Sequence, residues 1–108
     1  MYTMESDEKS QGKKGLPKNK IIDVISIADD TLTYSLFSSK SSVEDVVCYG
    51  ISVSSKKMHG IEVDKITDIT TDYNLARKIY MDIIDGFVTP ISLRNVVEDY
   101  IVSIYSYN

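Results

Sequence analysis

Side chains suited to catalysis are scarce in this 108-residue chain, which contains one histidine and one cysteine. His59 lies between Met58 and Gly60 in a segment typical of an exposed turn, where a general base or metal ligand lacks a positioned partner. Cys48 lies in a run typical of a strand, where a thiol more often packs as a small apolar group than reacts. Neither residue indicates a reaction, and one cysteine excludes an intramolecular disulfide.

The carboxylates do not form a recognisable catalytic or metal-binding pattern. Asp64, Asp68 and Asp72 lack the spacing and central glycine of a calcium loop, and Asp72 is equally well placed to cap a helix. Glu98 and Asp99 are adjacent on a predicted helix, so their side chains diverge towards solvent. The sequence contains no Cys-x-x-Cys, glycine-rich phosphate loop, Gly-x-Ser-x-Gly or His-Glu-x-x-His motif. We therefore predict no enzymatic activity and assign no catalytic, cofactor-binding or metal-binding residue.

Tyrosine is abundant, with eight residues in a chain that has no tryptophan. Three of them gather near the C-terminus, and tyrosine is enriched on protein surfaces that are both apolar and wet. The alternative is that Tyr100 packs in the core and that the last two fray with the chain end. The interaction surface predicted on this side of the closing helix consists of Arg94, Glu98, Asp99, Tyr105 and Tyr107.

Composition and charge are those of an ordinary globular domain, with 43% hydrophobic and 26% charged residues. Residues 1–20 carry five lysines and three acidic residues, a net +2, whereas residues 21–108 carry seven basic and thirteen acidic residues, a net −6. The acidic domain disfavours nucleic-acid binding, and its lysine-rich leader would give only weak, salt-dependent attachment. No apolar run approaches the ~18 residues of a membrane span, and the leader lacks a signal-peptide core. We expect a cytoplasmic protein.

The chain divides into a disordered polar leader, residues 1–20, and a single domain, residues 21–108. β-branched residues and apolar alternation predict strands in the first half of the domain. Gly50 marks a bulge or kink, and a change of parity near Lys65 and Ile66 indicates an irregular register. The predicted strands are residues 21–27, 32–37, 46–54 and 61–69.

Two helices follow, because the apolar period lengthens after the last strand. Asp72 is a suitable cap for the first helix, and Gly86 is a natural C′ residue after its end. Thr89 and Pro90 give the second helix a cap and a first residue that needs no amide partner. The predicted helices are residues 72–85 and 90–105.

This order of elements predicts an α+β fold, in which a four-stranded antiparallel β-meander is followed by two C-terminal helices packed on one sheet face. The short connection between the helices is expected to tuck Phe87 and Val88 under the corner. The sheet face expected beneath the helices carries Leu32, Tyr34, Tyr49, Ile51 and Ile61.

Three stretches, residues 49–51, 66–72 and 88–100, carry recognisable motifs, and helix formation does not require the longest, Thr-Pro-Ile-x-Leu followed by Val-Val-Glu-Asp. They resemble a family of small uncharacterised proteins from clostridia and related spore-forming bacteria, classed as a domain of unknown function. In that family a Tyr-Gly strand precedes an Ile-x-Asp-Ile-(Ser/Thr)-x-Asp helix entry and a Val-(Thr/Ser)-Pro-Ile-x-Leu-x-x-Val-(Ile/Val)-Glu-Asp closing helix. The resemblance covers about residues 45–102. It implies a bacterial cytoplasmic protein with no established activity, cofactor or partner.

The function favoured by these patterns is a non-catalytic protein-interaction or regulatory module. Its partner would be an unidentified protein or a second copy of the chain, with neither nucleic acid nor membrane expected. The alternative is a small-molecule- or metal-binding domain with a site between sheet and helices, suggested by the small polar face of the third strand and by Asp68.

Overall fold

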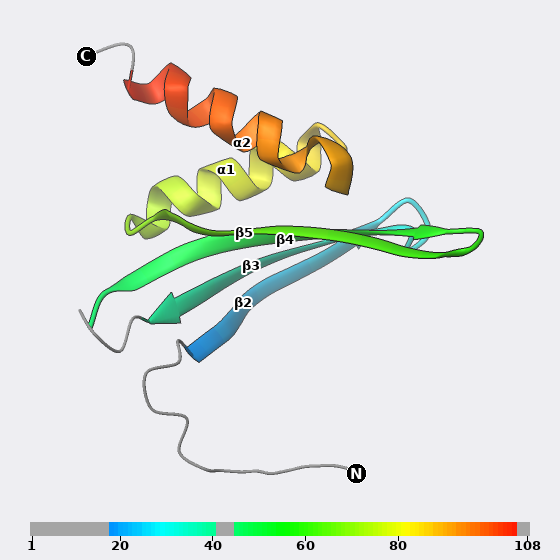
Figure 1. Ribbon diagram of the computed structural model, residues 1–108, viewed down its shortest axis with the longest axis horizontal. Helices are drawn as coiled ribbons and strands as arrows, with labels where there is room; N and C mark the ends of the chain where they lie inside the picture. Colours follow the sequence, from blue (N-terminus) through cyan, green and yellow to red (C-terminus); the bar gives the residue numbers. More distant parts are fainter. Residues whose placement is uncertain (1–17, 41–44, 106–108) are drawn as a thin grey trace, which may run out of the picture.

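The computed structural model describes residues 18–40 and 45–105 as a four-stranded antiparallel sheet followed by two helices (Figure 1). The strands pair in chain order, and both helices lie on the same side of the sheet, which confirms the predicted α+β meander. The elements are β2 (Lys18–Ile27), β3 (Leu32–Lys40), β4 (Val47–Lys57), β5 (Gly60–Thr70), α1 (Tyr73–Asp85) and α2 (Pro90–Tyr105). The first strand begins three residues earlier than predicted, and the rest of the predicted disordered leader, residues 1–17, lies outside the described residues.

Alternation of large apolar residues along β3 and β4 produces the core. Cross-strand partners share a face, and Tyr34 pairs with Val53 as Leu36 pairs with Ile51, all four fully buried. α1 and α2 complete this cluster from above the sheet with Ala76, Ile79, Tyr80, Ile83, Ile84, Leu93 and Val97. The helices therefore cover one sheet face and leave the other uncovered in the described part of the chain (Figure 1).

Two buried tyrosines fix the helices on the sheet. The Tyr34 hydroxyl donates to the Val88 carbonyl at the corner between the helices, at 2.8 Å. The Tyr80 hydroxyl of α1 donates to the Tyr34 carbonyl, at 3.2 Å. Because a buried hydroxyl needs a partner, these bonds fix where each helix rests as well as satisfying the polar groups.

Both helices begin where the sequence predicts. The Asp72 carboxylate caps α1 by accepting hydrogen bonds from the backbone N–H groups of Asn74 and Leu75, and Pro90 is the first residue of α2. Neither helix in residues 18–40 and 45–105 is both long and apolar enough to cross a membrane.

The end of α1 differs from the prediction. Gly86 is the C-cap itself, with φ −89°, and the left-handed C′ position falls on Phe87, with φ 53°. The amides of Phe87 and Val88 donate to the carbonyls of Ile84 and Ile83, the pair of bonds of a Schellman motif. Phe87 is also 64% exposed, so the prediction that it tucks under the corner is wrong, although Val88 is half-buried there.

The covered sheet face was predicted correctly except in β5. The connection from β4 to β5 has only two residues, Met58 and His59, so Ile61 pairs with Lys56. This register turns Ile61 to the uncovered face, where 65% of it is exposed. The other predicted residues of the covered face lie on it: Leu32, Tyr34, Tyr49 and Ile51.

The predicted irregularities are present near Gly50. Tyr49 pairs with Thr70 and Ile51 with Ile66, so three β5 residues stand opposite Gly50 alone. Asp68, the middle residue of this bulge, has φ 56°. The change of parity from Ile66 to Ile69 therefore reflects this bulge, whereas the change from Val63 to Ile66 is a change of face in a regular register.

Candidate functional site: the open face of the sheet

The uncovered side of the sheet, called the open face below, is defined by the cross-strand pairs that alternate with the core pairs. Three rows cross it: Ser26, Thr33, Ser54 and Val63; Val24, Ser35, Ser52 and Lys65; and Ile21, Phe37 and Gly50. Asn19, Ser39 and Cys48 extend it at one end, and Lys56 and Ile61 extend it at the other. These sixteen residues come from all four strands.

The open face combines exposed aliphatic groups with hydroxyls. Ile21, Val24, Ile61 and Val63 are between 50% and 65% exposed. Between them lie serine and threonine side chains, of which Ser26 and Thr33 share a hydrogen bond of 2.9 Å between their hydroxyl oxygens. Single exposed aliphatic residues are ordinary, but four on one uncovered sheet face indicate a surface suited to contact.

The charge of this face is opposite to that of the chain. Lys56 and Lys65 are its two charged residues, and none of its sixteen residues is Asp or Glu, whereas the whole chain has a net charge of −4. Glu62 and Asp64 of β5 occupy even-numbered positions, on the other face of the strand. There Asp64 forms an ion pair with Arg94, and Glu62 forms one with Lys57. The strand pairing thus separates two lysines from the surrounding carboxylates.

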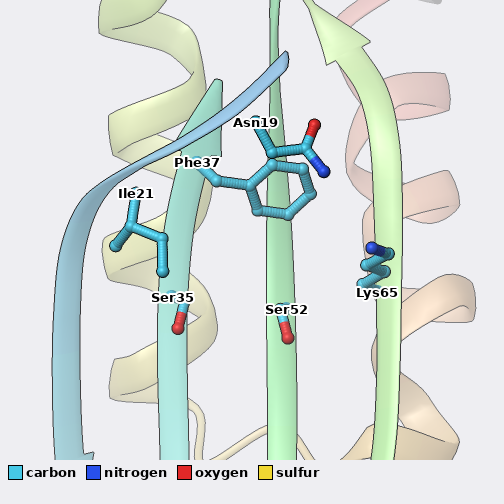
Figure 2. A pocket seen from close by; sticks show the side chains of 6 residues that line it. All are labelled: Asn19, Ile21, Ser35, Phe37, Ser52 and Lys65. Atoms are coloured by element: carbon cyan, nitrogen blue, oxygen red, sulfur yellow. The ribbon is translucent and has the colours of Figure 1, made fainter. Parts of the chain in front are cut away.

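A hollow of about 200 Å³ opens in this face, lined by Asn19, Ile21, Ser35, Phe37, Ser52 and Lys65 (Figure 2). In Figure 2 these side chains stand in front of the strands and the helices lie behind them. The lining provides two hydroxyls, an amide and an ammonium group beside an aliphatic and an aromatic side chain. This chemistry suits a group that is apolar along its length and carries an acceptor at its tip.

The hollow owes its shape to the absence of a side chain at Gly50. A Cβ there would clash with the Ile66 carbonyl oxygen and lie 2.6 Å from Cζ of Phe37. The Phe37 ring therefore lies against the backbone of β4 and is only 5% exposed, although it belongs to the open face. Lys65 places its Nζ 5.8 Å from the ring centroid, a cation–π contact that holds the ammonium at the edge of the hollow.

Two serine hydroxyls line the hollow. The hydroxyls of Ser35 and Ser52 have no histidine among the lining residues to take up a proton, because His59 lies in the β4–β5 turn. Within residues 18–40 and 45–105, no three His, Cys, Asp or Glu side chains gather as a metal-binding group. Cys48 is half-buried at one end of the face.

The surface predicted on α2 is only partly brought together. Arg94 reaches β5, where its Nη2 lies 3.8 Å from Oδ1 of Asp64, while Glu98 and Asp99 are exposed. Tyr105 is the last residue of α2, and Tyr107 lies outside the described residues. The prediction for this surface stays open, since an exposed ion pair is a weak constraint.

The space between sheet and helices, where the alternative prediction places a ligand, is occupied by core side chains. Burial raises the pKa of the Tyr34 phenol, and burial followed by the nearby Asp23 carboxylate raises that of Tyr80. Both hydroxyls are used in hydrogen bonds to backbone carbonyls, so they anchor the helices.

The hollow itself is not evident from the sequence. Its signal is the run of small side chains at Gly50 and Ser52, which predicts a face meeting solvent or another backbone. The sequence does not give the strand register, which places Phe37 opposite Gly50 on one side and opposite Ile21 on the other.

Comparison with known protein families gives a match over most of the chain. Residues 19–103 match the family described as "Family of unknown function (DUF6514)". Comparison with curated proteins and with solved structures gives no match.

Proposed function

We propose that this chain, which belongs to the DUF6514 family of unknown function, is a non-catalytic module that binds a partner protein through its open face. One observation carries the proposal: a sheet face that no other element of residues 18–40 and 45–105 covers combines four exposed aliphatic residues, several hydroxyls and two lysines without a carboxylate. Such a mixture of apolar contact area and hydrogen-bonding groups is typical of protein-binding surfaces.

The edges of the sheet are less suited to binding than its face. β2 has a register shift between Ile21 and Asp23, and β5 has the bulge around Asp68. Bulges and charged residues on outer strands discourage pairing with another strand. Docking across the face is therefore the better-supported mode.

The size of the face favours a reversible complex. With strands about 4.8 Å apart and a rise of about 3.4 Å per residue, sixteen residues on one face span roughly 500 Å². Standard stable interfaces bury about 800 Å² per partner. A face of this size fits a short segment of a partner, bound transiently.

A small-molecule ligand is the second candidate, and the hollow beside Phe37 would be its site in place of the sheet–helix interface. Its volume of about 200 Å³ lies below the roughly 300–1,000 Å³ of typical ligand pockets. It matches one protein side chain better than a whole metabolite. This supports a peptide-like occupant.

The test compares matched surface variants of the full chain. Val24→Asp with Val63→Asp places two charges on the open face, and Glu98→Lys with Asp99→Lys places two charges on the predicted α2 surface. A partner identified from the native host is purified, and its dissociation constant is measured against each variant. We expect the open-face pair to lose at least tenfold in affinity and the α2 pair to bind like wild type. Loss of binding confined to the α2 pair would overturn the proposal in favour of that surface.

A further inference from the structure

We propose that the segment bound on the open face is an extended acidic–apolar peptide, with a carboxylate on Lys65, a second on Lys56 and an apolar side chain in the hollow beside Phe37. This rests on the proposed function and specifies the chemistry of the partner. The order of residues along the strands carries the inference.

The two lysines are separated by a distance that suits an extended chain. Lys65 pairs with Ser52, which is four residues before Lys56 on β4, so the lysines lie about 13 Å apart along the strands. An extended peptide lying along β4 and β5 places its side chains i and i+4 on one face at the same spacing. Two acidic residues four positions apart therefore reach both ammonium groups.

The rows between and beyond the lysines each offer an apolar side chain. The row between them carries three hydroxyl residues and, on β5, Val63, which is 61% exposed. On the far side of Lys65 lies the row of Ile21, Phe37 and Gly50, which contains the hollow. The inward-facing side chains of the peptide should thus alternate apolar, acidic, apolar, acidic, beginning at the hollow.

Charge selects this occupant over the two other obvious ones. A second copy docked face to face would bring Lys56 and Lys65 against the same lysines with no carboxylate to meet them. A nucleic acid would gain two cations but meet a chain of net charge −4. At physiological ionic strength the screening length is about 8 Å, so a short peptide senses the lysines it contacts more than carboxylates on the far side of the domain.

The test uses three capped heptapeptides with serine at positions 2, 4 and 6. The probe has leucine at positions 1 and 5 and glutamate at 3 and 7, and the two controls replace both glutamates by glutamine or by lysine. Binding to the full ¹⁵N-labelled chain is followed by amide chemical shifts. We expect shifts around Ser35, Ser52 and Lys65, and an affinity order of glutamate over glutamine over lysine.

Two variants make the result specific. Lys65→Met should weaken the glutamate probe on the order of threefold, and Lys65→Met with Lys56→Met on the order of tenfold, while the glutamine peptide is unaffected. Thermal unfolding checks that each variant is folded. Equal binding of the three peptides, no binding of the glutamate probe, or shifts confined to α2 would overturn the inference.

The outcome separates this inference from the proposed function. If a purified partner needs the open face but ignores both lysine substitutions, the inference fails and the proposed function stands. If the partner binds elsewhere, the proposed function fails.

Two further measurements test the other occupants of the open face. A dimer in light scattering that Val24→Asp with Val63→Asp dissociates would assign the face to a second copy. Competition by a single-stranded oligonucleotide would assign it to nucleic acid. Both results would overturn the inference.

Discussion

The Tyr34 hydroxyl and the Val88 carbonyl oxygen lie 2.8 Å apart, joining the middle of the sheet to the corner between the two helices. These residues are 54 positions apart in the chain. The bond thus links the meander to the helical pair at one defined point.

Removing this hydroxyl should destabilise the protein. Tyr34→Phe leaves the Val88 carbonyl without its partner, and we expect the free energy of unfolding to fall by about 1–2 kcal/mol. Urea unfolding measures the change. Tyr73→Phe is the control, since Tyr73 is 39% exposed and its edge contact with Tyr49 persists in phenylalanine. An equal effect of the two substitutions would contradict the role given to the bond.

Phe87→Gly should stabilise the protein. Phe87 has φ 53° and is 64% exposed, so glycine relieves left-handed strain of about 1 kcal/mol while giving up little packing. Phe87→Ala removes the same ring but keeps a Cβ, so we expect a smaller increase in the free energy of unfolding than for Phe87→Gly. Thermal unfolding of both variants compares them. A destabilised glycine variant would show that the ring makes contacts that outweigh the strain.

Gly50→Ala should be strongly destabilising. The new Cβ meets the Ile66 carbonyl oxygen and the Phe37 ring, and overpacking of this kind costs about 1–3 kcal/mol. Adding Phe37→Ala should restore only part of the loss, because the backbone clash remains. Full recovery in the double variant would show that the aromatic ring alone forbids the side chain.

Stability should decline above pH 10. Burial raises the pKa of the Tyr34 and Tyr80 phenols above their ordinary value of 10.0, so the folded state favours the protonated form. Their contribution to the free energy of unfolding is complete below pH 10. It is lost as the pH rises further, because these two phenols lose their protons in the unfolded chain before they do so in the folded one. The slope is at most about 1.4 kcal/mol per pH unit for each tyrosine.

Tyr80→Phe provides the comparison for this pH dependence. Urea unfolding between pH 9 and pH 11 should show a shallower decline in the variant than in wild type. Identical slopes would mean that the Tyr80 phenol ionises alike in the folded and unfolded states.

The open face should tolerate polar substitution without loss of stability. Val24 and Val63 are 50% and 61% exposed, so Val24→Thr with Val63→Thr should change the free energy of unfolding by less than about 0.5 kcal/mol. The same pair should weaken partner binding. A large loss of stability would show that these valines serve the fold.

Local signals in the sequence predict the elements well. The cap at Asp72 and the proline at position 90 act within one turn, and the alternation of Tyr34 and Leu36 follows from the strand period, so each is legible without the tertiary structure. They were sufficient for the α+β class, for the face covered by the helices in β3 and β4, and for the start of both helices.

The remaining features depend on register and on competition between neighbours. Ile61 was assigned to the wrong face because the two-residue turn at Met58 and His59 sets its partner. The left-handed position fell on Phe87 because Gly86, the first residue after α1, is the C-cap itself rather than C′. The hollow arises from a cross-strand pair, which no local pattern identifies.

The pairing of β2, β3, β4 and β5 in chain order also bears on how the protein folds. Hairpins of this kind close short loops, so the sheet can assemble from local contacts at low entropic cost. The bonds that join α1 and the corner between the helices to β3 span 46 and 54 residues. We expect docking of the helices to be the late, slow step, with the meander already formed while its future core is still wet.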